Sequence, residues 1–509
     1  MTGSSDREKA LEKLVSAVGD ARAHLLDSWE ATALLESLGY TDGRIRREFG
    51  FPDAAALGEY VFGALAGRVR PAADTIVPPQ PHALRDLIDC IGASMVAALP
   101  WLGTFLIERV RHGTPTGIAG LPLSLSLMLS LIVSGGFIQA ISRRGRFYLG
   151  LKQPGLARMV TSYLFRLGVL TSGAAALAGL VVGWYVNLFP WPYLILWADQ
   201  FVVLCALWLT CGMLAVHEEH WRVLPAFGVG ALTFVAVRAA GQDVRLAQLI
   251  GSGAALGAAA WQVPRVFARA GIGGQLSDAP LPRMSVLLYR ALPFFAYGTL
   301  YFCFLFAGRL SALASGSALS GSPSGMEPPY KLGMDLALLS FLFASAGIEY
   351  GSLRFTRLLT RAMQEPFDPT GGIFARRLGR IHLRVLAIVV CTFIPISGLV
   401  GGLAKRLLSG QPPLVWTTVA VGDLGFLLVA FGLVNGLALF SFNRPWSAVT
   451  AMSLAIIVTV TVGSVLSHLS NPYFSSAGLV AGGFVFALQT SVVVRHTIRM
   501  GDHAVSAPA

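Results

Sequence analysis

The chain has 509 residues, of which 54% are hydrophobic and only 13% are charged, and its mean hydropathy is +0.64. An ordinary soluble domain carries about 25% charged residues, and hydrophobic cores stop growing near about 250–300 residues. This composition therefore excludes a soluble enzyme, a disordered chain and a secreted disulfide scaffold, and it predicts an all-α polytopic membrane protein. The net charge of +12 is typical of basic cytoplasmic loops, an interpretation that we favour over nucleic-acid binding.

Residues 1–82 are polar and precede the first long apolar stretch. Their apolar positions predict several short helices, the last of them over 54–68, where Pro52 and Asp53 suit a helix start. A linker with four prolines follows between Pro71 and Pro81. We expect a small cytoplasmic helical cap that touches the basic inner loops or a partner protein.

A membrane-spanning helix needs about 20 mostly apolar residues, and about twelve stretches of the chain meet this requirement. The fifth and sixth are the weakest, because they are short and charged residues lie between them. One helix fewer, or a re-entrant pair at that point, stays open as an alternative. The predicted spans are 86–107, 118–141, 167–189, 193–216, 223–240, 245–263, 285–308, 332–350, 384–404, 414–441, 446–467 and 473–494.

The placement of Lys and Arg predicts the topology. With the N-terminus inside, the inner loops and the C-terminal tail hold 20 Lys and Arg, and the outer loops hold 8, where Arg384, Arg238 and Arg245 at the ends of spans are counted with the adjoining loops. Cytoplasmic loops of membrane proteins carry the excess of basic residues. We therefore expect both termini in the cytoplasm, and the longest outer loop is predicted over 309–331.

Two features recur at similar spacing and predict an internal repeat. Asp199 lies in the fourth span and Asp423 in the tenth, 224 positions later, and two basic segments after the second and eighth spans lie about 210 residues apart. Two halves of six helices with the same orientation fit these offsets, and many transporters contain such parallel repeats. The predicted parts are the cap and linker at 1–82, a first lobe at 83–263, an inter-lobe linker at 264–284, a second lobe at 285–496 and a tail at 497–509.

Three patches of sequence carry a resemblance to a known family. The first runs from Tyr330 through Asp335 to Glu349 and continues into Arg354-Phe-Thr-Arg. The others are Phe137-Ile-Gln-Ala-Ile-Ser-Arg-Arg-Gly-Arg and the turn Phe440-Ser-Phe-Asn-Arg. On these patches the chain resembles the multidrug/oligosaccharidyl-lipid/polysaccharide (MOP) flippase superfamily, and within it most of all the Pel exopolysaccharide exporter family.

The resemblance implies a transporter, not an enzyme, that moves a polysaccharide or lipid-linked glycan across the bacterial inner membrane by alternating access of two lobes. Two other functions stay open: a membrane enzyme that acts on lipid-linked sugars, and a scaffold for an exopolysaccharide synthase. The sequence contains no P-loop motif and no His-Glu-x-x-His spacing, so neither a nucleotide cofactor nor a metal site is predicted.

Ionisable side chains at membrane depth are costly, and they usually face a cavity or pair with one another. We predict that such side chains line a pathway for the substrate or a coupling ion. The alternative is a structural ion pair, for instance between Arg290 and one of the aspartates. The candidates are Arg290, Asp335, Asp199 and Asp423.

Six arginines lie in the two basic segments. Their simplest role is to set the topology. A sharper hypothesis is that they bind anionic lipid headgroups or dock a cytoplasmic glycosyltransferase or synthase. They are Arg143, Arg144, Arg146, Arg354, Arg357 and Arg361. Asp86 and Asp89, beside the inner end of the first span, are expected at headgroup level.

Overall fold

The computed structural model describes most of the chain. Its described residues are 3–21, 28–66, 84–92, 94, 117–151, 153–216, 222–268, 284–315, 328–364, 372–408, 410–469 and 474–500. Within these ranges every regular element is a helix. Residues 95–116, and with them most of the first predicted span, lie outside the described residues.

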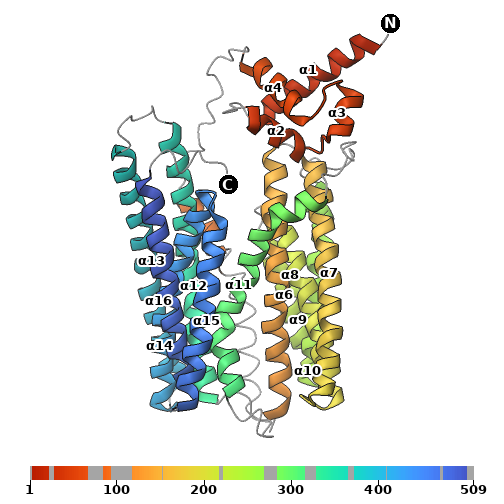
Figure 1. Cartoon of the computed structure of the whole chain (residues 1–509). Coiled ribbons are helices and arrows are strands. Elements are labelled where there is room, and N and C mark those ends of the chain that lie inside the picture. Colours follow the sequence, from red (N-terminus) through yellow and green to blue (C-terminus); the bar gives the residue numbers. More distant parts are fainter. Residues whose placement is uncertain are drawn as a thin grey trace.

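The long helices form two lobes that stand side by side (Figure 1). The first lobe contains α6 (Gly117–Gly150), α7 (Pro154–Tyr185), α8 (Trp191–Ala215), α9 (Val223–Ala239) and α10 (Val244–Phe267). The second contains α12 (Pro328–Gln364), α13 (Gly372–Leu407), α14 (Pro413–Ser441), α15 (Pro445–Leu469) and α16 (Ser475–Arg499). The structure thus confirms the all-α, two-lobe fold.

The two lobes repeat one packing pattern. In the first lobe α6 contacts α7 and α8, and α10 contacts α8 and α9. In the second lobe α12 contacts α13 and α14, and α16 contacts α14 and α15. These four contacts of the first lobe therefore have counterparts between the corresponding helices of the second, as expected for parallel repeats.

Nine of the described helices are long and apolar enough to span a membrane, namely α6, α7, α8, α11 (Met284–Ser315), α12, α13, α14, α15 and α16. This number is lower than the predicted twelve for two reasons. The first span is mostly outside the described residues, and the fifth, α9, has only 17 residues. The sixth, α10, contains 24 residues but is not among the nine. The two helices that the sequence marks as weakest are therefore the ones that fall short.

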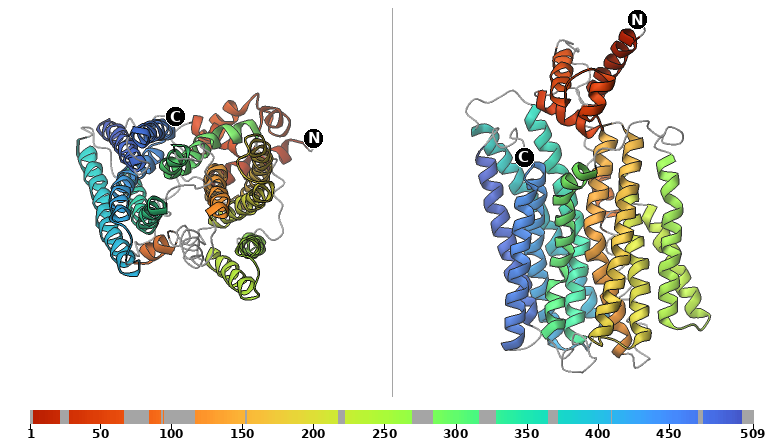
Figure 2. Two further views of the ribbon diagram at one scale, coloured as in Figure 1. Left: turned by 90° about the horizontal axis from the view of Figure 1, so that it is seen from below. Right: turned by 45° about the vertical axis from the view of Figure 1, so that its right-hand side comes forward.

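Helix α11 runs between the lobes and contacts both (Figures 1 and 2). We call the end of the bundle beside α1–α4 the near end and the opposite end the far end. Toward the near end α11 packs on α6, and Phe137 and Phe295 meet edge to face with ring centres 4.9 Å apart. It also packs on α15 and α16. The predicted second lobe, 285–496, includes α11 from residue 285 onward, and this helix contacts both lobes.

Glycines let α6 and α11 approach closely. A Cβ atom on Gly298 would lie 2.5 Å from the backbone oxygen of Gly135, and one on Gly136 would lie 2.7 Å from the backbone oxygen of Phe295. Small residues allow such backbone approach between membrane helices. Any larger side chain here must push the two helices apart.

We expect Gly298→Ala to destabilise the protein by about 1–3 kcal/mol, because the new methyl group meets backbone that has no room to move. The matched control is Gly257→Ala in α10, where a Cβ would meet no described atom of a neighbouring helix within 4 Å. That change should stabilise its helix by up to about 1 kcal/mol. The thermal unfolding midpoints of both variants in detergent test this, and a Gly298→Ala midpoint at or above that of the control would contradict it.

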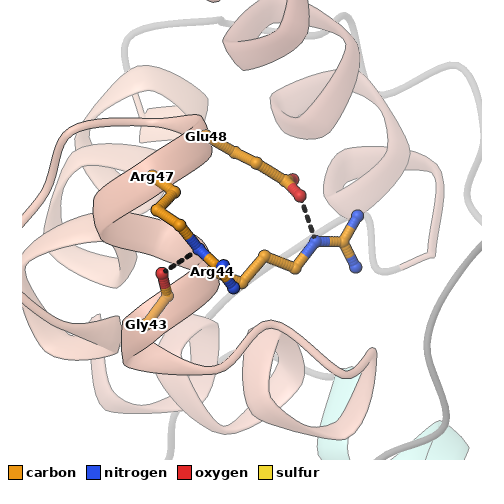
Figure 3. A network of polar contacts seen from close by, with 4 residues as sticks. All are labelled: Gly43, Arg44, Arg47 and Glu48. Carbon is orange, nitrogen blue, oxygen red and sulfur yellow. Dashed lines mark hydrogen bonds and ion pairs between the residues drawn. The ribbon is translucent and has the colours of Figure 1, made fainter.

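The N-terminal helices form a small domain at the near end (Figure 2). They are α1 (Gly3–Ala21), α2 (Ser28–Ser37), α3 (Asp42–Glu48) and α4 (Ala54–Ala66). The Asp53 carboxylate accepts a hydrogen bond from the Ala56 N–H at 2.8 Å and so caps α4, as the sequence suggests. On α3, Arg44 Nε donates to Glu48 and Arg47 Nε donates to the Gly43 carbonyl, at 2.8 and 3.1 Å (Figure 3).

The N-terminal domain is fastened to the first lobe. Its buried apolar side chains, Leu35 among them, form one cluster with those of α6 and α7. The Tyr148 hydroxyl at the near end of α6 donates a hydrogen bond to the Ser37 carbonyl at 3.3 Å. The domain therefore sits on the lobe through a shared core, and it covers the end of α6 that carries the first basic segment.

Candidate transport site

Asp335 is held in a buried ion pair with an arginine that the sequence assigned to a loop. Arg309 Nη1 lies 2.5 Å from Asp335 Oδ1, and Arg309 Nη2 donates to the Met334 carbonyl at 2.9 Å. The Arg309 side chain is only 1% exposed. The prediction of an outer loop from 309 was wrong, because α11 continues to Ser315. Asp335 thus forms a structural ion pair, which was the alternative to a pathway role, and its partner is Arg309 and not Arg290.

The same pair belongs to a polar network that binds α11 to the second lobe. The Tyr330 hydroxyl donates to the Gly308 carbonyl at 3.2 Å and accepts from Ser475 Oγ at 2.7 Å. These contacts join α11, α12 and α16 toward the far end of the bundle. Asp335 and Arg309 therefore hold the end of α11 in place and offer little surface to a substrate.

Asp199 and Asp423 lie in corresponding helices but in different surroundings. Asp199 on α8 is exposed. Asp423 on α14 is 9% exposed, and Ser397 Oγ on α13 donates to its Oδ2. The two residues stand at corresponding positions because the fold is repeated. Only Asp199 is exposed, so the two carboxylates are not equivalent.

Glu349 is the ionisable residue at the lobe interface that the candidate set missed. Its side chain is exposed although it lies in the middle of α12. The groups with which it interacts electrostatically are Arg146 on α6, Tyr301 on α11 and Cys90 in the segment 84–92. A carboxylate that meets groups from both lobes and is still exposed faces the space between them. The predicted span 332–350 placed Glu349 at a helix end, whereas α12 continues to Gln364.

A cluster of one arginine and three aromatic rings connects the lobes at the near end. Arg143 of α6 lies over the ring of Phe294 in α11 at 5.5 Å and over that of Phe440 in α14 at 5.8 Å. Phe294 and Phe440 stack at 5.3 Å, and Tyr297 meets Phe440 edge to face at 4.8 Å. We call these four residues the near-end cluster. It joins α6 of the first lobe to α14 of the second through side-chain contacts.

The remaining predicted arginines make contacts of several kinds. Arg357 binds both carboxylate oxygens of Asp86, and its Nη2–Oδ1 distance is 3.0 Å. Arg146 donates to the Ala215 carbonyl at 3.2 Å, and Arg354 lies over the Tyr350 ring at 5.6 Å. Arg290 and Arg144 lie within electrostatic reach of each other and of Tyr148. The side chain of Arg361 is outside the described residues.

Comparison with solved structures places this arrangement in a known fold. A MATE transporter in complex with MaD3S matches with a TM-score of 0.56 and 11% identity, over 82% of this chain and 96% of that one. A mutant of the MATE transporter VcmN from Vibrio cholerae matches with a TM-score of 0.54 and 12% identity, over 83% and 97%. The chain has the fold of MATE transporters.

A third solved structure has the same fold. It is an outward-facing multidrug resistance MATE family transporter of the MOP superfamily, with a TM-score of 0.51 and 13% identity over 82% of this chain and 96% of that one. No protein-family model and no curated protein sequence matches the chain. The MATE fold accords with the MOP resemblance, and at these identities the likeness is one of fold alone.

Proposed function

We propose that this protein is an alternating-access transporter that exports a polysaccharide or lipid-linked glycan across the bacterial inner membrane. One observation carries the proposal. The near-end cluster joins the two lobes of a MATE-like fold through side-chain contacts between α6, α11 and α14. Contacts of this kind can separate without unfolding either lobe. Two packed bodies with a breakable contact at one end are suited to rigid-body switching.

The glycan cargo rests on the resemblance of three sequence patches to the Pel exporter family. The distribution of Lys and Arg supports a cytoplasmic near end, with both termini inside. The N-terminal domain would then face cytoplasmic glycosyltransferase or synthase subunits. Because the sequence contains no P-loop, an ion gradient, the membrane potential or polymer synthesis supplies the energy.

Within this proposal the carboxylates have separate roles. Glu349 contacts the cargo or a coupling ion, because it is exposed between the lobes. Asp423 and Asp199 stay candidates for the ion pathway, one buried and one exposed. Asp335 positions α11 through Arg309. Arg290 belongs to a basic group at the near end.

The experiment compares cells that lack the gene with cells that express Glu349→Gln. We expect polymer or lipid-linked glycan to accumulate inside both, with its synthesis and chemistry unchanged. The control is Asp243→Asn, an exposed carboxylate at the start of α10 away from the interface. Altered product chemistry would favour the enzyme, and normal export with a mislocalised synthase would favour the scaffold; either result would overturn the proposal.

A further inference from the structure

Two antiparallel helix pairs at the near end have the same geometry but different charges. One pair is α12 with the segment 84–92, and the other is α6 with α11. On one side Arg357 of α12 faces Asp86 in the segment 84–92, and the two form an ion pair. On the other side Arg144 of α6 faces Arg290 of α11, within electrostatic reach. Helices α6 and α12 hold corresponding places in the two lobes, so an arginine faces a carboxylate in one repeat and a second arginine in the other.

The register of the two pairs supports this correspondence. One to two helical turns further into the bundle, Phe137 of α6 meets Phe295 of α11. In the second pair, Glu349 of α12 interacts with Cys90 of the segment 84–92 at the equivalent level. In each pair, therefore, the two helices are antiparallel. The number of residues between the two contacts along a helix agrees between the pairs to within one residue. The facing arginines replace an ion pair that the fold forms elsewhere.

Two further arginines add to the positive charge. Arg143 and Arg146 are exposed and interact with each other electrostatically. Arg143 lies over the rings of Phe294 and Phe440. Glu349 of α12 interacts electrostatically with Arg146 across the lobe interface. The charges that act on Arg143 and Arg144 come from other arginines and from tyrosines.

One donor of this group is unused. The Nε atom of Arg144 is buried and has no hydrogen-bond partner among the described residues. A buried donor without a partner carries a free-energy cost, and a guanidinium is the side chain that binds phosphate and carboxylate oxygens through a fork of N–H donors. Within the described ranges, Arg144 and Arg290 therefore both lack an anion, because Arg290 stands where the other repeat has the Asp86 carboxylate.

We propose that Arg143, Arg144, Arg146 and Arg290 form a binding site for a phosphate group. The phosphate belongs either to a phospholipid headgroup or to a lipid-linked cargo. The second source rests on the proposed function. The phosphate oxygens accept from Arg144 and Arg290 and replace the missing carboxylate. The N-terminal domain borders the site, because Tyr148, which lies near both arginines, is bonded to Ser37.

The test uses the full chain in micelles of dodecyl maltoside, a detergent that contains no phosphate. Binding of inorganic pyrophosphate is measured by calorimetry, and retention of added phosphatidylglycerol is measured by native mass spectrometry. We expect Arg144→Gln and Arg290→Gln each to weaken binding about tenfold or more, since each removes a charged hydrogen-bond donor. Arg290→Asp supplies the carboxylate of the other repeat, so it should keep the fold and abolish binding.

The control is Arg265→Gln, which removes the same charge from α10, where Arg265 lies over the Trp261 ring. It should leave binding unchanged. Retention of phosphatidylglycerol that pyrophosphate does not displace identifies the lipid as the source, and pyrophosphate binding without lipid retention identifies the cargo; both support the site. Equal binding by Arg290→Asp and the unaltered protein, or an equal loss in Arg265→Gln, would overturn it. Intact export by Arg290→Asp would overturn a cargo role while leaving the transport proposal standing.

Discussion

Replacing Arg309 by methionine is expected to lower the free energy of unfolding by about 3–5 kcal/mol, because it leaves the charge of Asp335 buried without its partner. Arg309 is 1% exposed and Asp335 is 13% exposed, so water reaches neither side chain well enough to compensate. The loss concentrates at the far end of α11, where the pair joins this helix to α12.

The double variant Arg309→Met with Asp335→Leu provides the control. Removing both charges avoids the unpaired carboxylate, and buried ion pairs replaced by apolar side chains are often neutral in stability. We therefore expect the double variant to recover most of the loss. Unfolding free energies measured in bicelles decide the matter. A double variant as unstable as Arg309→Met alone would show that the pair is not the cause.

Phe440→Ala should shift the protein toward a state in which the near ends of the lobes separate. The change removes the stack on Phe294, the edge contact with Tyr297 and one ring beneath Arg143. Aromatic pairs contribute about 0.5–1.5 kcal/mol each, and a cation over a ring about 0.5–1 kcal/mol. Their joint loss corresponds to about a tenfold or larger change in the ratio of closed to open molecules.

Spin labels on Arg158→Cys of α7 and Trp446→Cys of α15 report this shift, in a background without the native cysteines. Both positions are exposed. The control is Phe484→Ala, which removes a ring that is 56% exposed on α16. We expect Phe440→Ala to lengthen the distance between the labels and Phe484→Ala to leave it unchanged. Identical distances in the two variants would contradict a closing role for the cluster.

Much of the fold was predictable because it depends on patterns that the sequence displays directly. Long apolar runs predicted the spans, and the matched offset of Asp199 and Asp423 predicted two corresponding halves. The weak fifth and sixth spans were also visible, as short runs with charges between them. These features are local or periodic, so hydropathy and spacing are enough to find them.

The charged residues were harder to assign, because pairing depends on helices far apart in the sequence. A hydropathy scan ends a span where a charge appears, so it placed Arg309 in a loop and Glu349 at a helix end. The structure extends both helices past these charges, since Arg309 finds a carboxylate and Glu349 faces the lobe interface. The seven residues between the predicted end at 308 and the true end at Ser315 include Arg309, and this difference was enough to hide the ion pair.

Alternating access of the two lobes requires that two distances, each measured in its own double-cysteine variant, change in opposite directions. The near-end pair is Arg158→Cys with Trp446→Cys, and the far-end pair is Leu188→Cys with Leu407→Cys, whose native side chains are 53% and 66% exposed. Pulsed electron paramagnetic resonance gives the distance distribution of each pair in proteoliposomes. We predict two populations in which the near-end distance lengthens as the far-end distance shortens. A single population at both ends, or distances that change in the same direction, would contradict the account.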